Sequence, residues 1–193
     1  MPRSASPRET EIKLQMASAR SARRLLLQAG FVIQIRRVFE VNIIFDTPDN
    51  ALRRKNNLLR LRQAGRRAIF TFKGATQPSR YKSRDEIESD VADPQALTTI
   101  LAGLGYQAVF RYEKFRTVYH KPNRPGSVML DETPIGDYLE IEGAPRVIDR
   151  IAGELGYSSN NYITASYGGL YLDHCRSSGA TPRNLIFKGR RRN

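Results

Sequence analysis

The sequence predicts an α+β fold in which about eight antiparallel strands close into a barrel, with four short helices packed outside it. Three observations support this fold class. Eight segments combine period-two alternation with high β-propensity, four others carry helix start or stop signals, and most connections between strands are short, which favours antiparallel pairing. Because nearly every strand is charged on one face only, closure would place that face inside the barrel.

The expected strands run from the first charged segment of the chain to residue 142. They are residues 9–15, 31–45, 58–63, 67–73, 81–91, 109–120, 127–131 and 138–142. Two segments, 25–45 and 100–120, each contain a helix end, then a glycine and an aromatic residue, then a long strand. This likeness suggests a duplicated unit of one helix and its following strand.

The four expected helices are short and lie between the strands. Their start signals are, in chain order, Ser18, Asp93 with Pro94, Pro145 and Thr164. Gly30 and Gly156 end the first and the third helix. We expect Tyr167 and Tyr171, four residues apart on the last helix, to lie in the core, and contact between Tyr167 and a substrate is the alternative.

The net charge of +13 and the pI near 10.3 make nucleic acid a candidate partner, so the location of the charge matters. The first eight residues contribute +2 and the last eleven +5, which leaves +6 for residues 9–182. We therefore divide the chain into a disordered basic tail (1–8), one domain (9–175) and a second basic tail (176–193). Weak, salt-sensitive contact with nucleic acid through the tails is an alternative to simple solvation.

The sequence contains no sign of a membrane segment or of disulfide bonding. No window approaches the roughly 18 apolar residues of a membrane span, and Cys175 is the only cysteine. We expect a cytoplasmic protein that does not contact membranes.

The segment ETEIKL shows the alternation on which the functional argument depends. In an extended strand Glu9, Glu11 and Lys13 share one face, whereas Ile12 and Leu14 share the other. The same one-sided charge recurs in Arg60 and Arg62, Thr71 and Lys73, Arg84, Glu86 and Glu88, Lys114 and Arg116, and Glu140 and Glu142. A sheet with its charged face in water would explain any one of these strands.

Taken together, the charged faces require counter-charges. Like charges two residues apart on a strand, about 6.7 Å, repel by roughly 2–3 kcal/mol at an effective dielectric near 20. The two Glu-x-Glu pairs offer hard oxygen ligands suited to Mg²⁺ or Mn²⁺. The basic set predicts a polyanionic ligand and consists of Lys13, Arg60, Arg62, Lys73, Arg84, Lys114 and Arg116.

These segments resemble the CYTH superfamily of triphosphate tunnel metalloenzymes, which includes class IV adenylyl cyclases, thiamine triphosphatases and inorganic tripolyphosphatases. ETEIK is similar to the E-x-E-x-K signature of that superfamily. It is followed in the family order by FDTPDNAL, LLRLR, TFKG, SRDEIE, YEKFRTVY, LDETPIGDYLEIEG and SYGGL. The resemblance covers roughly residues 9–172 and is nearest to bacterial and archaeal proteins of the class IV cyclase type. Many members carry a lysine just before the late Ser-Tyr, where this chain has Ala165.

The resemblance implies a tunnel that holds a triphosphate and a divalent metal. It assigns metal binding to Glu9, Glu11, Glu140 and Glu142, with Asp131 and Glu86 or Glu88 as further ligands. It assigns triphosphate binding to Lys13, Arg60, Arg62, Lys73, Lys114 and Arg116. We add Arg84 to this set because the alternation of charged residues places it on the same face. Glu9, Glu11 and Lys13 are the residues that we expect to be catalytic.

Three functions follow as hypotheses. Hydrolysis of tripolyphosphate or of a nucleoside or thiamine triphosphate ranks first, because the sequence reveals neither an adenine pocket nor a base for a ribose 3′-hydroxyl. Class IV adenylyl cyclase activity, which yields cyclic AMP and pyrophosphate, is the alternative. A non-catalytic binder of polyphosphate or RNA is the third, although carboxylates would repel a nucleic-acid backbone. A P-loop is absent from the sequence, and the resemblance also allows a homodimer.

Overall fold

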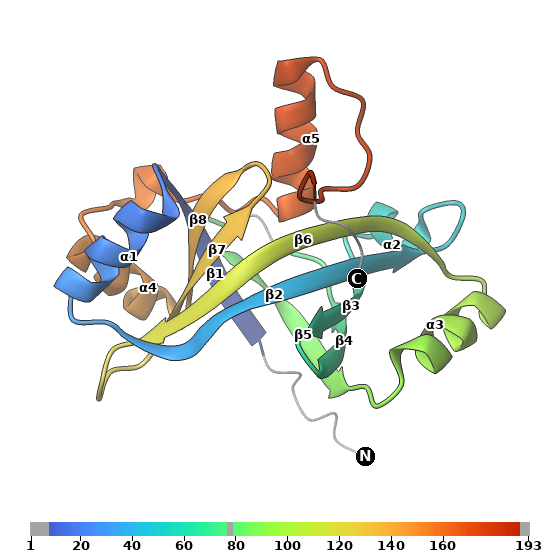
Figure 1. Ribbon diagram of the computed structural model, residues 1–193, viewed down its shortest axis with the longest axis horizontal. Coiled ribbons are helices and arrows are strands. Elements are labelled where there is room, and N and C mark those ends of the chain that lie inside the picture. Colours follow the sequence, from blue (N-terminus) through green and yellow to red (C-terminus); the bar gives the residue numbers. More distant parts are fainter. Residues whose placement is uncertain (1–7, 77–78, 190–193) are drawn as a thin grey trace.

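The computed structural model describes residues 8–76 and 79–189, in which eight strands and five α-helices are present (Figure 1). The strands are β1 (Arg8–Met16), β2 (Val32–Asp46), β3 (Leu58–Ala64), β4 (Arg67–Lys73), β5 (Lys82–Asp90), β6 (Gln107–His120), β7 (Ser127–Thr133) and β8 (Gly136–Glu142). The helices are α1 (Ala19–Gln28), α2 (Ala51–Arg54), α3 (Pro94–Gly103), α4 (Pro145–Glu154) and α5 (Tyr167–Ser178). Among the described residues, none of these helices is long and apolar enough to cross a membrane.

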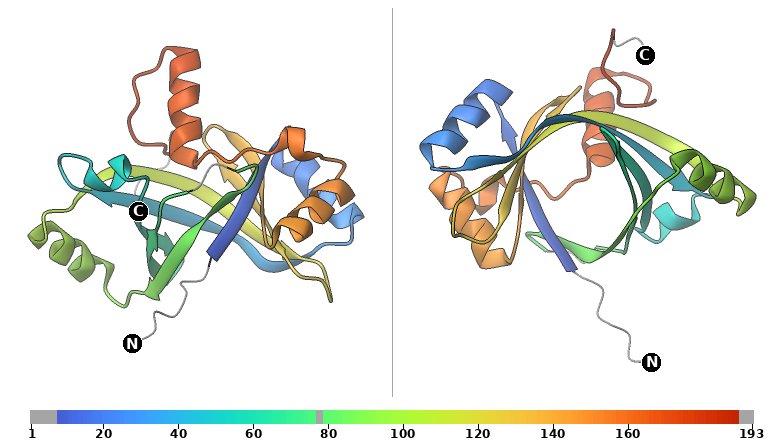
Figure 2. Two further views of the ribbon diagram at one scale, coloured as in Figure 1. Left: turned by 180° about the vertical axis from the view of Figure 1, so that it is seen from behind. Right: turned by 60° about the horizontal axis from the view of Figure 1, so that its bottom comes forward.

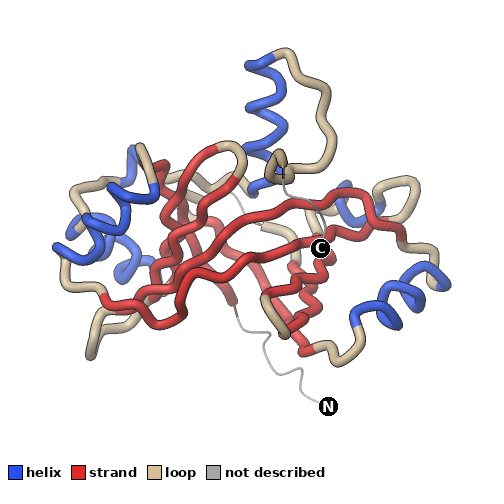
Figure 3. Tube along the Cα trace, viewed as in Figure 1, coloured by secondary structure: helices blue, strands red, loops and turns tan. Residues whose placement is uncertain are grey.

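The strands form a closed antiparallel barrel, which confirms the predicted fold class. Their order around the barrel is β1-β5-β4-β3-β2-β6-β7-β8, and β1 pairs with β8 to close it. The right panel of Figure 2 looks into this ring of strands. The two longest strands, β2 and β6, follow α1 and α3 and pair with each other along most of their length (Figure 3).

Much of the apolar core lies outside the barrel, where outward-facing residues of the strands meet the helices. On β1, Ile12 and Leu14 are fully buried and pack with Leu139 and Ile141 of β8. The helices α1 and α4 cover this face (Figure 1). The buried residues that they contribute are Ala22 and Leu26 of α1 and Ile148, Ile151 and Ala152 of α4. The apolar half of ETEIKL therefore faces helices, and the charged half faces the barrel interior.

The predicted helix starts hold for three of the four helices. The side chains of Ser18 and Asp93 accept hydrogen bonds from the first turns of α1 and α3, and Pro145 is the first residue of α4. The last helix begins at Tyr167 and is capped by Ser166, not by Thr164. The reason is that Ile163 forms a two-way backbone bridge with Lys13 of β1, which keeps the chain extended up to that point.

The C-terminal segment after α5 returns to the barrel. Leu185 is buried and pairs in parallel with Tyr112 of β6, and Asn184 Oδ1 accepts a hydrogen bond of 2.9 Å from the Arg111 backbone N–H. We call residues 182–187 the C-terminal strap. The expected N-terminal tail, apart from Arg8, and residues 190–193 lie outside the described residues.

A charged cavity inside the barrel

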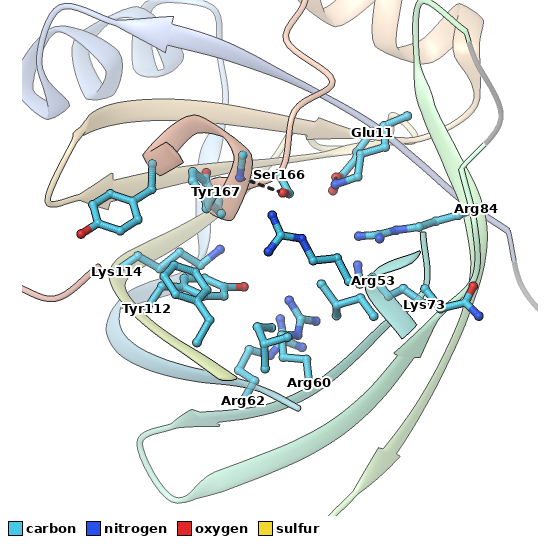
Figure 4. Close-up of a pocket in the computed structure, with 18 of the residues that line it drawn as sticks. Glu11, Arg53, Arg60, Arg62, Lys73, Arg84, Tyr112, Lys114, Ser166 and Tyr167 are labelled. Carbon is cyan, nitrogen blue, oxygen red and sulfur yellow. Dashed lines mark hydrogen bonds and ion pairs between the residues drawn. The ribbon is translucent and has the colours of Figure 1, made fainter. Parts of the chain in front are cut away.

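The barrel encloses a cavity of about 1180 Å³ that the charged faces of the strands line (Figure 4). Thirteen of the fourteen residues predicted for the site line it, and Asp131 is the exception. Eleven basic and seven acidic side chains surround the cavity. With all of them ionised the lining is net positive, so its complementary ligand is an anion.

Carboxylates gather on one side of the cavity, where β1 meets β5 and β8. Lys73 Nζ lies 2.6 Å from Glu9 Oε2 and 2.7 Å from Glu86 Oε2, so this ammonium group bridges the two carboxyl groups. Burial, together with the neighbouring Glu9 carboxyl group, raises the pKa of Glu86. Burial alone would raise the pKa of Glu9 as well, but its interactions with Glu86 and Lys73 lower it. Of the two carboxyl groups, Glu86 therefore favours the protonated form and Glu9 the ionised form.

Glu142 is the second carboxyl group that favours its protonated form. Burial and the like charges of Glu9, Glu140 and Glu11 raise its pKa to about 7. Its backbone pairs with Glu11 of β1, which places two carboxylates opposite each other across the β1–β8 seam. The repulsion inferred from the sequence is therefore present in the fold.

The donor chemistry on this side suits a hard divalent cation. Among the described residues, no three histidine, cysteine or carboxylate side chains are already arranged to hold a metal ion. Mg²⁺ does not require such a cage, because it commonly uses one or two carboxylates and completes its shell with water and substrate phosphates. A cation bound here would also replace the protons that Glu86 and Glu142, whose pKa values are raised, tend to retain.

Lysines separate the remaining carboxylates. Lys13 Nζ lies 3.3 Å from Glu11 Oε1 and 3.2 Å from Glu140 Oε1. Burial alone would lower the pKa of Lys13, but these two carboxylates raise it. Lys82 Nζ lies 2.7 Å from Glu11, yet burial and the nearby Lys13 lower the pKa of Lys82 to about 8.

Asp131 lies behind the cavity wall and orients the cations of β6. It is fully buried, and its oxygens accept bonds from Arg116 (2.7 and 2.6 Å), from Lys114 (2.8 Å) and from the Tyr167 hydroxyl (2.6 Å). Arg116 also contacts Glu140. Asp131 therefore orients cations of the wall and does not itself line the cavity.

The cations on β3 and β5 differ in how fully they are paired. Arg60 and Arg62 share Glu88 at 3.5 and 3.4 Å, and Arg60 lies 3.8 Å from Glu86. Burial alone would lower the pKa of Arg60, but its interactions with the Tyr112 hydroxyl and with the two glutamates raise it. Arg84 is 9% exposed, and its Nε has no hydrogen-bond partner in the described part of the chain.

Several cavity residues escaped the sequence analysis. Lys82 stands two residues before Arg84, so extending the alternation by one step would have found it. Tyr112 was hidden because an aromatic residue at such a position normally indicates a core. Tyr167 is buried in a core cluster, as predicted, and also lines the cavity. Glu40 was also missed; it is buried 3.7 Å from Lys114 and is not one of the residues that line the cavity, and the register shifts of β2 conceal its phase in the sequence.

The sequence is similar both to a family model and to a curated protein. The family model of the CYTH domain matches residues 7–167. A curated relative from Methanocaldococcus jannaschii, named "Putative adenylate cyclase", is 28% identical over 169 residues, which cover 82% of this chain and 95% of the relative.

Solved structures agree in fold. A protein from Pyrococcus horikoshii superposes with a TM-score of 0.72 at 23% identity, covering 86% of this chain and 99% of the other. A protein from Hippeastrum superposes with a TM-score of 0.63 at 21% identity, covering 90% and 97%. The description of the Hippeastrum protein names it an adenylyl cyclase candidate and reports a dominant triphosphatase activity.

Proposed function

The chain belongs to the CYTH family, and we propose that it is a divalent-metal-dependent enzyme that hydrolyses a triphosphate bound in its barrel. The observation that carries this proposal is the charge of one cavity, which combines a carboxylate cluster with an excess of basic side chains. Carboxylates collect at the β1–β5–β8 side, while Arg60, Arg62, Lys114 and Arg116 line the rest of the wall.

Phosphoryl transfer requires positioning and charge neutralisation more than covalent chemistry. In the proposed complex, the basic wall would bind the phosphate oxygens through charge-assisted bonds, with the arginine side chains binding bidentately. Asp131 would hold Lys114 and Arg116 in place. Lys13 and Lys73, each already between two carboxylates, would complete the charge balance around the phosphate nearest to the metal.

The family implies a divalent metal, and we propose Mg²⁺ or Mn²⁺ held by Glu9, Glu11, Glu140 and Glu142, with Glu86 next to them. When bound, such an ion neutralises charge on phosphate oxygens and lowers the pKa of a bound water. Glu88 and Asp131 are engaged with Arg62 and Arg116, and we give them the role of orienting those cations.

Cyclisation is a second candidate. The name of the M. jannaschii relative favours it, because that protein matches along nearly its whole length. The description of the Hippeastrum protein, which reports dominant triphosphatase activity, favours hydrolysis as the first choice. A cytoplasmic location and a homodimer stay predictions.

The deciding experiment incubates the protein with tripolyphosphate, thiamine triphosphate and ATP in the presence of Mg²⁺ or Mn²⁺. We expect orthophosphate as the product. If ATP instead gave cyclic AMP and pyrophosphate, the protein would be a cyclase and not a hydrolase. Tight binding without any turnover would leave only the hypothesis of a non-catalytic binder of polyphosphate or RNA.

A further inference from the structure

One end of the cavity is built by the C-terminal part of the chain. Tyr171 and Leu172 of α5 and Pro182, Arg183 and Asn184 of the strap all line it. The strap attaches to β6 by two backbone bonds of 2.9 Å, from the Leu185 N–H to the Arg111 carbonyl and from the Glu113 N–H to the Leu185 carbonyl. Pairing of β6 with β7 begins only at Phe115, so this edge of β6 is available to the strap.

Three stacked aromatic rings form the wall beneath the strap. The Phe110 ring lies 5.9 Å from that of Tyr112 with an interplanar angle of 24°, and 6.0 Å from that of Tyr171 with an angle of 20°. We call these three residues the aromatic wall. All three line the cavity, and Phe110 and Tyr171 are only partly buried although they are large and apolar. In Figure 4 the Tyr112 ring lies among the cavity side chains, close to Lys114.

The aromatic wall is continuous with the row of cations. Ile44 of β2 pairs with Arg60 on one side and with Phe110 on the other. Neighbouring strands are about 4.8 Å apart, so the backbones at Phe110 and Arg60 are separated by roughly 10 Å. Tyr112 joins the two regions, because its ring stacks on Phe110 while its hydroxyl interacts electrostatically with the Arg60 guanidinium.

An inorganic polyphosphate would leave this wall uncovered. The surface of a polyphosphate chain is made of phosphate oxygens, so it offers no flat apolar surface for the rings to stack on. A planar ring attached to one end of the phosphate chain would instead bury the exposed faces of Phe110 and Tyr171. Arg53, on α2, also lines the cavity and projects into it in Figure 4, where it can meet the connecting phosphate.

We propose that the aromatic wall is the subsite for a planar aromatic group esterified to the triphosphate, so that the protein selects organic triphosphates over inorganic tripolyphosphate. This inference rests on the proposed function, since the barrel must first hold the phosphates. A nucleobase and the pyrimidine of thiamine share the required chemistry, and ATP and thiamine triphosphate distinguish between them.

The test compares the binding of ATP, thiamine triphosphate and tripolyphosphate by titration calorimetry without divalent metal, and then compares kcat/KM with Mg²⁺. Phe110→Ala removes the central ring. We expect this variant to bind the preferred organic triphosphate about tenfold more weakly, relative to tripolyphosphate. A loss of this size is typical of one stacking ring. Phe110→Tyr keeps the ring and should retain the preference.

The controls separate a subsite from a general effect on folding. Ile87→Ala removes an apolar side chain that is 53% exposed on β5 and should leave the preference unchanged. If Phe110→Ala lost the same binding affinity for all three ligands, or lost none, the subsite would be overturned. Absence of turnover in the unmodified protein would instead reject the proposed hydrolysis, and the binding ratios would still decide whether the wall receives a ring.

Discussion

The Tyr167 hydroxyl donates a hydrogen bond of 2.6 Å to Asp131 Oδ2, and this bond links the first turn of α5 to the cation-bearing wall of the barrel. Both residues are buried, and burial with the adjacent carboxylate raises the pKa of Tyr167, so the phenol stays protonated and donating. Asp131 in turn holds Lys114 and Arg116. The C-terminal helix and the proposed phosphate site are therefore coupled through one carboxylate.

Tyr167→Phe removes that bond without removing the ring. A hydrogen bond to a charged group is worth about 1.5–3 kcal/mol, so we expect the melting temperature to fall by roughly 5 °C. Tripolyphosphate should bind more weakly because Lys114 and Arg116 lose part of their support. Differential scanning calorimetry and titration calorimetry measure these effects. Tyr157→Phe, which removes a hydroxyl 3.6 Å from the Met16 sulfur, is the control, and an equal effect there would refute the coupling.

Glu9→Gln and Glu11→Gln test the metal assignment. Mutating a residue that only hydrogen-bonds to a metal ligand typically lowers activity by about 10–100-fold. Because Glu9 and Glu11 are proposed to bind the metal directly, we expect kcat with Mg²⁺ to fall by more than about 100-fold in each variant. Release of orthophosphate from tripolyphosphate is the measurement, and the melting temperature should stay close to that of the unmodified protein. Asp90→Asn changes an exposed surface carboxylate and should keep full activity. Full activity in both glutamine variants would show that the metal lies elsewhere.

Arg60→Ala tests the basic wall. Losing charge-assisted bonds worth about 1.5–3 kcal/mol should raise KM for tripolyphosphate by roughly tenfold or more. The effect on kcat should be smaller if Arg60 chiefly binds the ground state. Steady-state kinetics provides both values, and Arg67→Ala, on an exposed ion pair, is the matched control. An unchanged KM would remove Arg60 from the site.

Arg84→Leu should separate stability from binding. Arg84 forms no ion pair within the described residues, and its guanidinium is nearly buried, so the metal-free and ligand-free protein bears its desolvation cost. We expect the variant to unfold at a higher urea concentration while binding tripolyphosphate about tenfold more weakly. A loss of stability would mean that Arg84 serves the fold and not a ligand.

The carboxylate cluster predicts a pH dependence of stability that a metal should reverse. Because the pKa of Glu142 rises from its ordinary value to about 7 in the folded protein, the folded state binds more protons than the unfolded state between these values. The free energy of unfolding should therefore decrease as the pH rises from about 5 to 7. Mg²⁺ should raise the melting temperature more at pH 8 than at pH 6. In Glu142→Gln the pH slope from this group should disappear, and an unaltered slope would contradict the assignment.

The sequence by itself determined which face of each strand is charged. Side chains alternate strictly along an extended chain, so Glu11 and Lys13 had to share a face opposite Ile12 and Leu14 in any pairing. The predicted strand bounds lie within two residues of those observed, and thirteen of the fourteen predicted site residues line one cavity. Local rules of capping also placed α1, α3 and α4.

Only the tertiary structure decided which charges meet. Glu9 and Glu86 both contact Lys73 because β5 pairs with β1 on one side and with β4 on the other. Asp131, in contrast, is enclosed by Lys114 and Arg116 of β6 and by Tyr167 of α5. The start of α5 and the return of the strap to β6 likewise depend on long-range backbone pairing. The physical reason is that alternation fixes the direction of a side chain, while its partner is fixed by the order and register of strands, which are distant in the sequence.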